Sequence, residues 1–395
     1  MRFGNPALIV LFVLFIGCGE TGGTDGSDTG GVAGTGGTSG TAGAGAIGGA
    51  GGQMISISDS IANPRILTRR VVRDAASRDA VCNDGTEAVY YFEAESESAQ
   101  GKWIILLQGG GGCANPERCM ERAQDEPHLT SSTDAPETIE LNGILAADAE
   151  LNADFFDWNA VQIKYCSSDN WHGSKAATEE PGGFHFRGHD IIGAVLEDLQ
   201  SESDFGSDHL GNATKVILAG VSAGANGVKH NLDRVAKLLS WADVRGLVDS
   251  EFHDRVVLGY PPAEETDFSE RIAYQGLVPD ASCAADELDP NICGSGMHVV
   301  LHHVTTPFFV VMDQSDFVVF GAAVDQTPER AAAFAESVRK LVQDHGAGFS
   351  SRTGRHGWML DSMAYRYEID GTSPLDSFAN WYFDRPGPKL VVQEP

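Results

Sequence analysis

The chain has 395 residues, which is too long for one small domain and suits one large domain with an additional segment. It carries 56 aspartates and glutamates against 27 lysines and arginines, a formal net charge of −29 at pH 7. An excess of negative charge this large argues against binding to nucleic acid or to a bare anionic membrane surface.

The first eighteen residues, MRFGNPALIVLFVLFIGC, predict an export signal. Arg2 supplies a basic start, and the apolar stretch from Ala7 to Ile16 is too short for a membrane span. Ile16-Gly17-Cys18 resembles the lipobox of bacterial lipoproteins, in which the cysteine is lipidated, although Phe15 stands where leucine is usual. We expect a lipid anchor at Cys18 as the only membrane contact, at the bacterial cell surface or in the periplasm. The alternative is an ordinary signal peptide and secretion.

Residues 19–55 are almost entirely glycine, threonine, alanine and serine. A segment of this composition buries too little apolar surface to offset its chain entropy. We therefore divide the chain into a signal segment, residues 1–18, a flexible tether, residues 19–55, and a folded domain, residues 56–395.

Apolar strands alternate with amphipathic helices in the folded domain. The predicted strands are Lys102–Cys113, Ala160–Cys166, Thr214–Ser222, Val244–Phe252 and Pro307–Asp316. The predicted helices are Asp190–Gln200, Pro328–Gly346 and Ser373–Phe383. This alternation predicts an α/β fold with a mostly parallel central sheet covered by helices on both faces. Ligands of such sheets bind at the carboxyl ends of the strands.

Six cysteines follow Cys18, and an even number in an exported protein indicates disulfides. The separations along the chain favour the pairs Cys113–Cys119 and Cys283–Cys293, which leaves Cys82–Cys166, although six cysteines allow other pairings. A metal site is not expected, because there is no paired C-x-x-C and the histidines do not lie at ligand spacing from the cysteines. No cofactor is expected.

The stretch Gly220-Val221-Ser222-Ala223-Gly224 stands where a predicted strand ends and a helix begins. It resembles the nucleophile elbow of α/β-hydrolases, in which a sharp turn exposes a serine hydroxyl and leaves room only for small neighbours. A glycine- and serine-rich turn is the alternative in a chain with 47 glycines. On the first interpretation Ser222 is a nucleophile, which needs a base, an acid to orient the base, and donors for an oxyanion.

Candidates for the acid and the base follow the serine in the chain order of α/β-hydrolases. Asp313 and Asp316 come after a predicted strand, where a carboxylate is well placed to orient an imidazole. The histidines beyond them are His345 and His356. His345 lies in the last turn of a predicted helix, where the helix dipole favours a histidine. His356 lies in a glycine-flanked loop and is the preferred base, while both acids remain candidates.

A glycine run, Gly109–Cys113, follows an earlier strand. Its backbone N–H groups, together with the N–H of Ala223, are candidates for an oxyanion hole. The alternatives are a flexible turn or a phosphate-binding loop, and a Walker A loop is excluded because Gly-Lys-Ser/Thr does not follow.

Several stretches resemble elements of the pectin acetylesterase and Notum family. LLQGGGGCANPERC is similar to the family's LEGGGWC, KYCSSDNWHG to YCDGASFSG, and FHFRGHDIIGAVLEDL to its FRG…I…A…DL stretch. VILAGVSAGANG is similar to LLSGCSAGG, FFVVMDQSDF to FFLNAAYDSWQ, and NWYFDR to DWYFDR. The similarities run in order from about Cys82 to Arg385, nearly the whole predicted domain.

The resemblance implies a serine carboxylesterase of the α/β-hydrolase type. The family's triad positions fall on Ser222, Asp316 and His356, and its oxyanion positions on Gly110, Gly111 and Ala223. The alignment therefore selects Asp316 over Asp313.

The chain also departs from the family. Gly112 stands where tryptophan is usual and Ala225 replaces the third glycine of the elbow, so we expect both to line the pocket and to affect substrate choice. Leu232 and Gly246 stand where plant members carry cysteines, which implies a different disulfide set.

These observations predict a monomeric carboxylesterase that removes acetyl or other short acyl groups from a polysaccharide. Trp171 and His172 are candidates for a roof over the pocket, with a core position as the more common role of a buried tryptophan. The alternatives are a Notum-like carboxylesterase for a longer acyl chain, and a non-catalytic carbohydrate- or protein-binding lipoprotein on the same fold. Deacetylated pectin is a polyanion, which so acidic a chain repels unless the cleft is locally basic. Arg118, Arg122 and Arg187 lie in the motif regions and are the candidates for that role.

Overall fold

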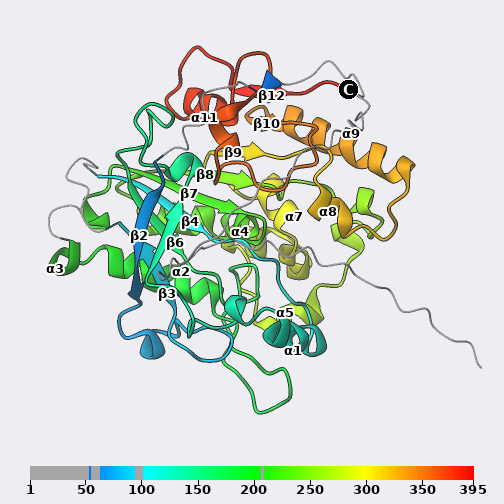
Figure 1. The fold of residues 1–395 in the computed structure, drawn as a ribbon. Helices are drawn as coiled ribbons and strands as arrows, with labels where there is room; N and C mark the ends of the chain where they lie inside the picture. The colour runs from blue at the N-terminus through cyan, green and yellow to red at the C-terminus, as the bar shows by residue number, and fades with distance from the viewer. Residues whose placement is uncertain (1–52, 55–62, 94–100, 206–208) are drawn as a thin grey trace, which may run out of the picture. The chain divides into compact units, whose positions relative to one another are not determined.

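A sheet of ten strands, in the order β12-β10-β9-β8-β7-β4-β6-β3-β2-β5, lies at the centre of the described part of the chain (Figure 1). The computed structural model describes residues 53–54, 63–93, 101–205 and 209–395, all within the unit formed by residues 49–395. The predicted signal segment, Cys18 and nearly all of the predicted tether lie outside the described residues.

Seven neighbouring strands of this sheet are parallel, as the alternation of strands and helices predicts. In sheet order they are β12 (Leu390–Val392), β10 (Gly348–Ser350), β9 (Phe308–Val311), β8 (Asp243–Asp249), β7 (Lys215–Val221), β4 (Lys102–Leu107) and β6 (Asn159–Ile163). Strand β4 is apolar on both faces, since Ile105 and Leu107 enter one core cluster while Ile104 and Leu106 enter another. The predicted α/β class is confirmed.

Three antiparallel strands extend the sheet beyond β6. They are β3 (Val89–Phe92), β2 (Arg65–Val71) and β5 (Thr138–Leu141), each antiparallel to the strand before it in the sheet. Strand β2 alternates buried and exposed residues at its start, the pattern of a strand with one solvated face. A separate pair of short strands, β1 (Gln53–Met54) and β11 (Tyr367–Glu368), is antiparallel as well.

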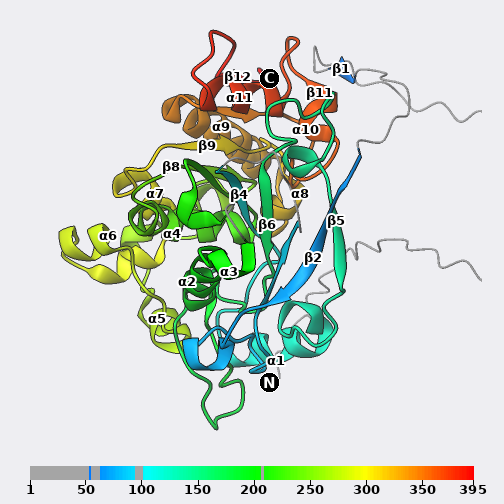
Figure 2. The same ribbon diagram turned by 90° about the vertical axis from the view of Figure 1, so that its left-hand side faces the viewer.

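Helices pack on both faces of the sheet. One core cluster joins the sheet to α2 (Gly188–Leu199), α4 (Ala223–Leu238) and α9 (Pro328–His345). The other joins it to α10 (Met363–Arg366) and α11 (Pro374–Tyr382). Figure 2 shows α2 and α4 on the side of the sheet opposite to α10 and α11. The remaining helices are α1 (Pro116–Asp125), α3 (Glu202–Phe205), α5 (Ser269–Gln275), α6 (Ala281–Asp286), α7 (Gly296–His302) and α8 (Phe317–Gly321).

Three disulfides cross-link the described residues: Cys82–Cys166, Cys113–Cys119 and Cys283–Cys293. They are the pairs that separation along the chain favoured. Disulfides persist in oxidising compartments, which agrees with the predicted export. Across the described ranges, every helix is too short or too polar to cross a membrane.

Candidate active site

Ser222 occupies a sharp turn between β7 and α4. Its backbone has φ 55° and ψ −120°, a conformation that side chains other than glycine rarely adopt. A Cβ added to Gly220 would lie 2.2 Å from the carbonyl oxygen of Gly224, and one added to Gly224 would lie 1.9 Å from that of Leu107. Both glycines are therefore required for the turn to pack against the sheet. Strain at this point is typical of a nucleophile elbow.

Asp316 and His356 form a buried pair. The Asp316 carboxylate has no exposed surface, and its Oδ2 lies 2.8 Å from Nδ1 of His356. Asp316 also caps α8, because its Oδ1 accepts the N–H groups of Val318 and Val319, each at 3.0 Å. Burial by itself lowers the pKa of His356, but its hydrogen bond with Asp316 and the attraction of that carboxylate outweigh burial, and the pKa is raised. This pairing orients the imidazole and stabilises its protonated form.

Asp313, the other acid considered, bonds to the loop that carries His356 but not to His356 itself. Its carboxylate is buried and accepts hydrogen bonds from Ser315, Ser351, Thr353 and Gly354, at distances between 2.6 and 3.1 Å. It fixes the start of the loop that carries His356. The pairing with His356 belongs to Asp316 alone, as the family alignment implies.

The other candidate histidine, His345, lies away from this pair. Its Nε2 is 3.0 Å from the carbonyl oxygen of Phe308, and its ring stacks on the Phe308 ring with the centroids 4.3 Å apart. His345 is thus part of the packing between α9 and β9.

Asp249 and Ser250, at the end of β8, connect the serine turn with the histidine loop. The Asp249 carbonyl accepts the N–H of Ser222 at 2.9 Å, and its buried carboxylate accepts the N–H groups of Trp358 and Met359 at 2.8 and 2.9 Å. Ser250 Oγ accepts the N–H of Gly357 at 2.8 Å. Sequence reasoning missed both residues, since they belong to an apolar strand and match no catalytic motif.

The glycine run lies directly against the Ser222 turn. A Cβ on Gly109 would be 2.6 Å from the carbonyl oxygen of Val221 and 3.3 Å from Cβ of Ser222. Gly110 and Gly111 have φ values of 136° and 67°, which only glycine adopts without strain. The carbonyl of Gly110 accepts a hydrogen bond from the buried Arg122 at 2.5 Å. This bond fixes the direction of that carbonyl and the position of the loop. Gly109 is therefore a neighbour of the Ser222 turn in the fold, Gly110 and Gly111 follow it in the chain, and their role in an oxyanion hole stays a prediction.

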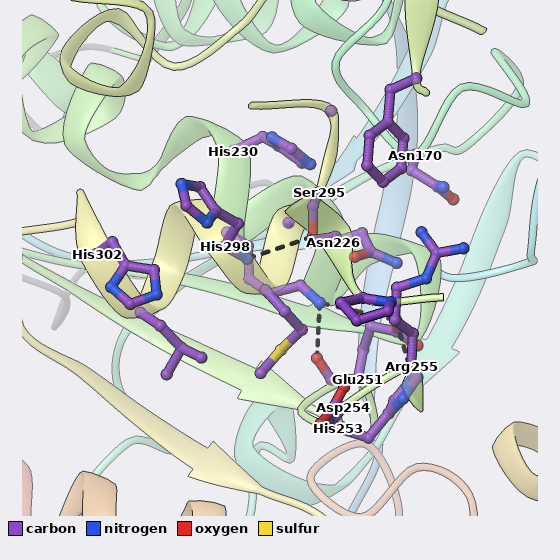
Figure 3. A pocket seen from close by; sticks show the side chains of 18 of the residues that line it. Asn170, Asn226, His230, Glu251, His253, Asp254, Arg255, Ser295, His298 and His302 are labelled. Atoms are coloured by element: carbon purple, nitrogen blue, oxygen red, sulfur yellow. Dashed lines mark hydrogen bonds and ion pairs between the residues drawn. The ribbon is translucent and has the colours of Figure 1, made fainter. Parts of the chain in front are cut away.

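Two cavities share a wall at this site. The Ser222 cleft, about 380 Å³, is lined by Ser222 and His356 together with Leu258, Val318, Val319 and Ala322. The polar cavity, about 470 Å³, has His230, His298 and His302 on one side and Glu251, His253 and Arg255 on the other (Figure 3). Glu251, His253 and Arg255 line both cavities, so a substrate at Ser222 has access to an apolar and to a polar subsite.

Charges in the shared wall are compensated. Lys229 is buried, and its Nζ donates to the Glu251 carbonyl at 2.8 Å and lies 3.7 Å from the Glu251 carboxylate. Burial alone raises the pKa of Glu251, but Lys229 and His253 outweigh it and hold the pKa at about 2. Deeper in the polar cavity, burial lowers the pKa of His172 well below its usual value and that of His230 to about 3. Both imidazoles are therefore neutral polar groups at neutral pH.

Several expectations about the pocket are wrong. Gly112 and Ala225 line neither cavity: a Cβ on Gly112 would lie 2.9 Å from the Ser168 carbonyl, and Ala225 is fully buried in the core. Trp171 is a core side chain rather than a roof, with no exposed surface and its Nε1 donating to the Gln108 carbonyl at 3.0 Å. His172, by contrast, does line the polar cavity.

The arginines expected to make the cleft basic lie elsewhere. Arg118, Arg122 and Arg187 pair with Glu121, Glu126, Asp79 and Asp190, and none lines either cavity. The cationic side chains that line the polar cavity are Lys229, Arg255 and Arg271. Arg255 and Arg271 lie outside the motifs in sequence, and Lys229 lies two residues beyond the serine motif, within α4, so the motifs did not identify them.

Comparisons with known proteins identify the family of this chain. The profile of the pectinacetylesterase family matches residues 61–341, most of the described chain. A palmitoleoyl-protein carboxylesterase notum2 of Xenopus laevis is 41% identical over 174 residues, 43% of this chain and 34% of the relative. The notum1' carboxylesterase of the same organism is 34% identical over 326 residues, 75% of this chain and 64% of the relative. The NOTUM carboxylesterase of Drosophila melanogaster is 29% identical over 350 residues, 83% of this chain and 50% of the relative.

The chain thus spans less than two thirds of the length of each of these relatives. The names of the family and of the relatives describe carboxylic ester hydrolases, the enzyme class that the sequence predicts. The profile ends before His356, so the choice of His356 as the candidate base is supported by its pairing with Asp316 and not by the profile. With the profile covering well over half of its length, this chain belongs to the pectinacetylesterase family.

Proposed function

We propose that the protein is a serine carboxylesterase with Ser222 as nucleophile, His356 as general base and Asp316 as the residue that orients the base. One observation supports this most strongly. Ser222, in its strained turn, and His356, paired with the buried Asp316, line the same cleft. Such a constellation activates a serine hydroxyl for attack on an acyl carbonyl.

The reaction follows from the positions of these groups. Ser222 Oγ attacks the ester carbonyl carbon while His356 Nε2 takes its proton, and Asp316 stabilises the imidazolium that forms. The N–H groups of Gly110, Gly111 and Ala223 are the proposed donors to the oxyanion. The proton then passes from His356 to the leaving alcohol. Water, activated by the same imidazole, hydrolyses the acyl-enzyme and restores Ser222.

We propose a polysaccharide as the acceptor of the acyl group, with acetyl or another short acyl group as the one removed. The polar cavity supports this choice, because its histidines, Asn170 and Asn226 offer donors and acceptors to a polyhydroxylated ligand beside the cleft. The name of the family refers to an acetylesterase of pectin. Lys229, Arg255 and Arg271 would offset the negative charge of a uronic acid, although Glu251 and Glu264 in the same cavity leave a neutral glycan equally suitable.

A longer acyl chain is the second candidate, and a specific observation favours it. The cleft wall opposite the charged residues is apolar, and Phe317 and Val318 beside it are 52% and 42% exposed. Relatives named for palmitoleoyl-protein hydrolysis point the same way. Each methylene that packs on such a wall contributes up to about 0.8 kcal/mol.

A panel of p-nitrophenyl acetate, butyrate and octanoate, beside acetylated xylan and acetylated pectin, tests both candidates. A short-chain enzyme shows kcat/KM falling beyond butyrate, whereas a steady rise to octanoate would replace the first proposal with the second. Ser222→Ala is the control: it removes one hydroxyl, and we expect kcat to fall by about 10³–10⁶ with Tm unchanged. If wild-type protein hydrolyses none of these esters but binds the glycans, the non-catalytic alternative holds.

The lipid anchor at Cys18 and the monomeric state remain predictions from the sequence. The proposed location is outside the cytoplasm, held to a membrane by the anchor, or free if Cys18 is not lipidated. The three disulfides support the export that both versions need.

A further inference from the structure

Two histidines and a glutamate converge beside the polar cavity, in the segment that contains α6 and α7. His298 lies in α7, His303 directly follows that helix, and Glu287 directly follows α6. Nε2 of His298 and Nε2 of His303 lie 2.7 and 3.0 Å from the same carboxylate oxygen, Oε1 of Glu287. The two imidazoles are 9% and 6% exposed, so the three polar groups meet at the edge of the interior.

The Nδ1 atom of each ring helps to decide whether hydrogen bonds alone or a metal ion hold this cluster together. Nδ1 of His298 is buried without a hydrogen-bond partner in the described part of the chain, and it faces the Glu264 carboxylate at 3.9 Å. Nδ1 of His303 faces Asp286 at 4.0 Å. If neutral imidazoles donate Nε2–H to Glu287, then each Nδ1 lone pair points at a carboxylate, which is repulsive. Protonated imidazoles would avoid this repulsion without a metal, and the metal titration below separates that alternative from a metal site.

A metal ion removes this conflict. When Nε2 of a neutral histidine binds a metal, Nδ1 carries the proton and donates it, most often to a carboxylate. Glu264 and Asp286 are the carboxylates that face the two Nδ1 atoms, at 3.9 and 4.0 Å, which is too far for a direct hydrogen bond but attractive to an N–H group. Cys283 forms a second group with the same two histidines, its sulfur and a nitrogen of each lying within 4.8 Å of one another, but its disulfide with Cys293 prevents it from acting as a thiolate ligand.

We propose that Glu287, His298 and His303 bind one divalent transition-metal ion, with Zn²⁺ as the best match to a two-histidine, one-carboxylate set. A fourth position is left for water. The sequence did not predict this site, because Glu287 and the histidines have none of the usual motif spacing and become neighbours only when α6 and α7 pack together. The ion joins the end of α6 to α7, and since His298 lines the polar cavity, it stiffens the wall of that cavity. His298 belongs to the cavity proposed above for the glycan, but Zn²⁺ binding can be measured whether or not the protein hydrolyses esters.

Metal titration of the full-length protein, purified without a polyhistidine tag and stripped with a chelator, tests this proposal. We expect one equivalent of Zn²⁺ to bind and to raise Tm. Co²⁺ in its place should give the visible absorption of a four-coordinate nitrogen and oxygen site. Glu287→Gln, which keeps the side-chain size, and His298→Ala should each weaken Zn²⁺ binding by at least about tenfold and abolish the rise in Tm.

His302→Ala is the matched control. His302 is exposed on the same helix, with its ring centroid 4.9 Å from that of His298, but it does not contact Glu287. This variant should bind Zn²⁺ like the wild type. The proposal is overturned if wild-type protein takes up no stoichiometric Zn²⁺, or if His302→Ala and Glu287→Gln lose the same affinity. The Gln variant retains the fold even if His298→Ala does not, so the comparison stays decisive.

Discussion

Replacing Asp316 with asparagine tests whether this carboxylate sets the tautomer of His356. The structure determines how the asparagine sits: its oxygen stays with the N–H groups of Val318 and Val319, because turning it around would break two hydrogen bonds that cap α8. Its NH₂ group then replaces Oδ2, the nearer acceptor of the Nδ1–H of His356 at 2.8 Å, and the remaining oxygen lies 3.1 Å from Nδ1 and already accepts two N–H groups. The proton moves to Nε2, and the imidazole cannot accept the proton of Ser222.

The expected loss is about 10⁴ in kcat, the size of the same change in serine protease triads, or about 5.4 kcal/mol of transition-state stabilisation. Stability should hardly change, since the cap of α8 is kept. Asp313→Asn is the matched variant, because this carboxylate is equally buried but bonds to the loop at 351–354. It should lower the free energy of unfolding by about 1–3 kcal/mol and keep most of kcat. Steady-state kinetics with p-nitrophenyl acetate and thermal unfolding measure both, and the opposite ranking of the two variants in kcat would refute the assignment.

Three further predictions concern the surroundings of the site. Because the pKa of His356 is raised above 6.5 and only the neutral imidazole acts as a base, kcat/KM should fall as the pH drops through a value above 6.5; an acidic limb well below pH 6 would contradict this. Asp249→Asn weakens the hydrogen bonds to the N–H groups of Trp358 and Met359, which fix the loop that carries His356. Because a small displacement of a catalytic group is costly, kcat should fall by about tenfold with little change in KM; an unchanged kcat would show that the contact is only structural. Cys18→Ser should move the protein from membranes to the soluble fraction without changing specific activity, and continued membrane association would argue against lipidation.

The parallel part of the fold was predictable because each of its central strands is an apolar run bounded by glycines or polar residues. Strand β4, predicted at 102–113, ends at Leu107, since the glycines that follow leave the sheet and pack against the Ser222 turn. The antiparallel strands were not predicted. Strand β2 carries three arginines in seven residues, and its pairing with β3 and β5 depends on contacts that no local pattern records.

The triad residues were predictable because the elbow motif and the chain order restrict the candidates to a few. The substrate pocket was not, because its lining comes from segments with no motif of their own. Glu251, His253 and Arg255 follow β8 in a loop, while Lys229 and His230 lie within α4, where helical spacing alone indicates a solvated or core position. Gly112 and Ala225 were expected in the pocket because they are next to motif residues. Gly112 instead packs against the backbone of another loop, and Ala225 is buried in the core.

The residue pattern alone could not decide between Asp313 and Asp316 as the partner of the histidine, whereas the backbone geometry does. Both acids follow β9, both are buried, and they are separated by three residues. Asp313 turns towards the backbone of residues 353–354, whereas Asp316 begins a short helix. The N–H groups of that helix bind one oxygen of Asp316, and both oxygens lie within hydrogen-bond distance of Nδ1 of His356, the other being the nearer at 2.8 Å. The two carboxylates thus support the same histidine by different means: one shapes the loop that carries it, and the other sets its proton. A variant of Asp313 should therefore change mainly the free energy of unfolding and a variant of Asp316 mainly kcat, so measuring both quantities separates the two roles.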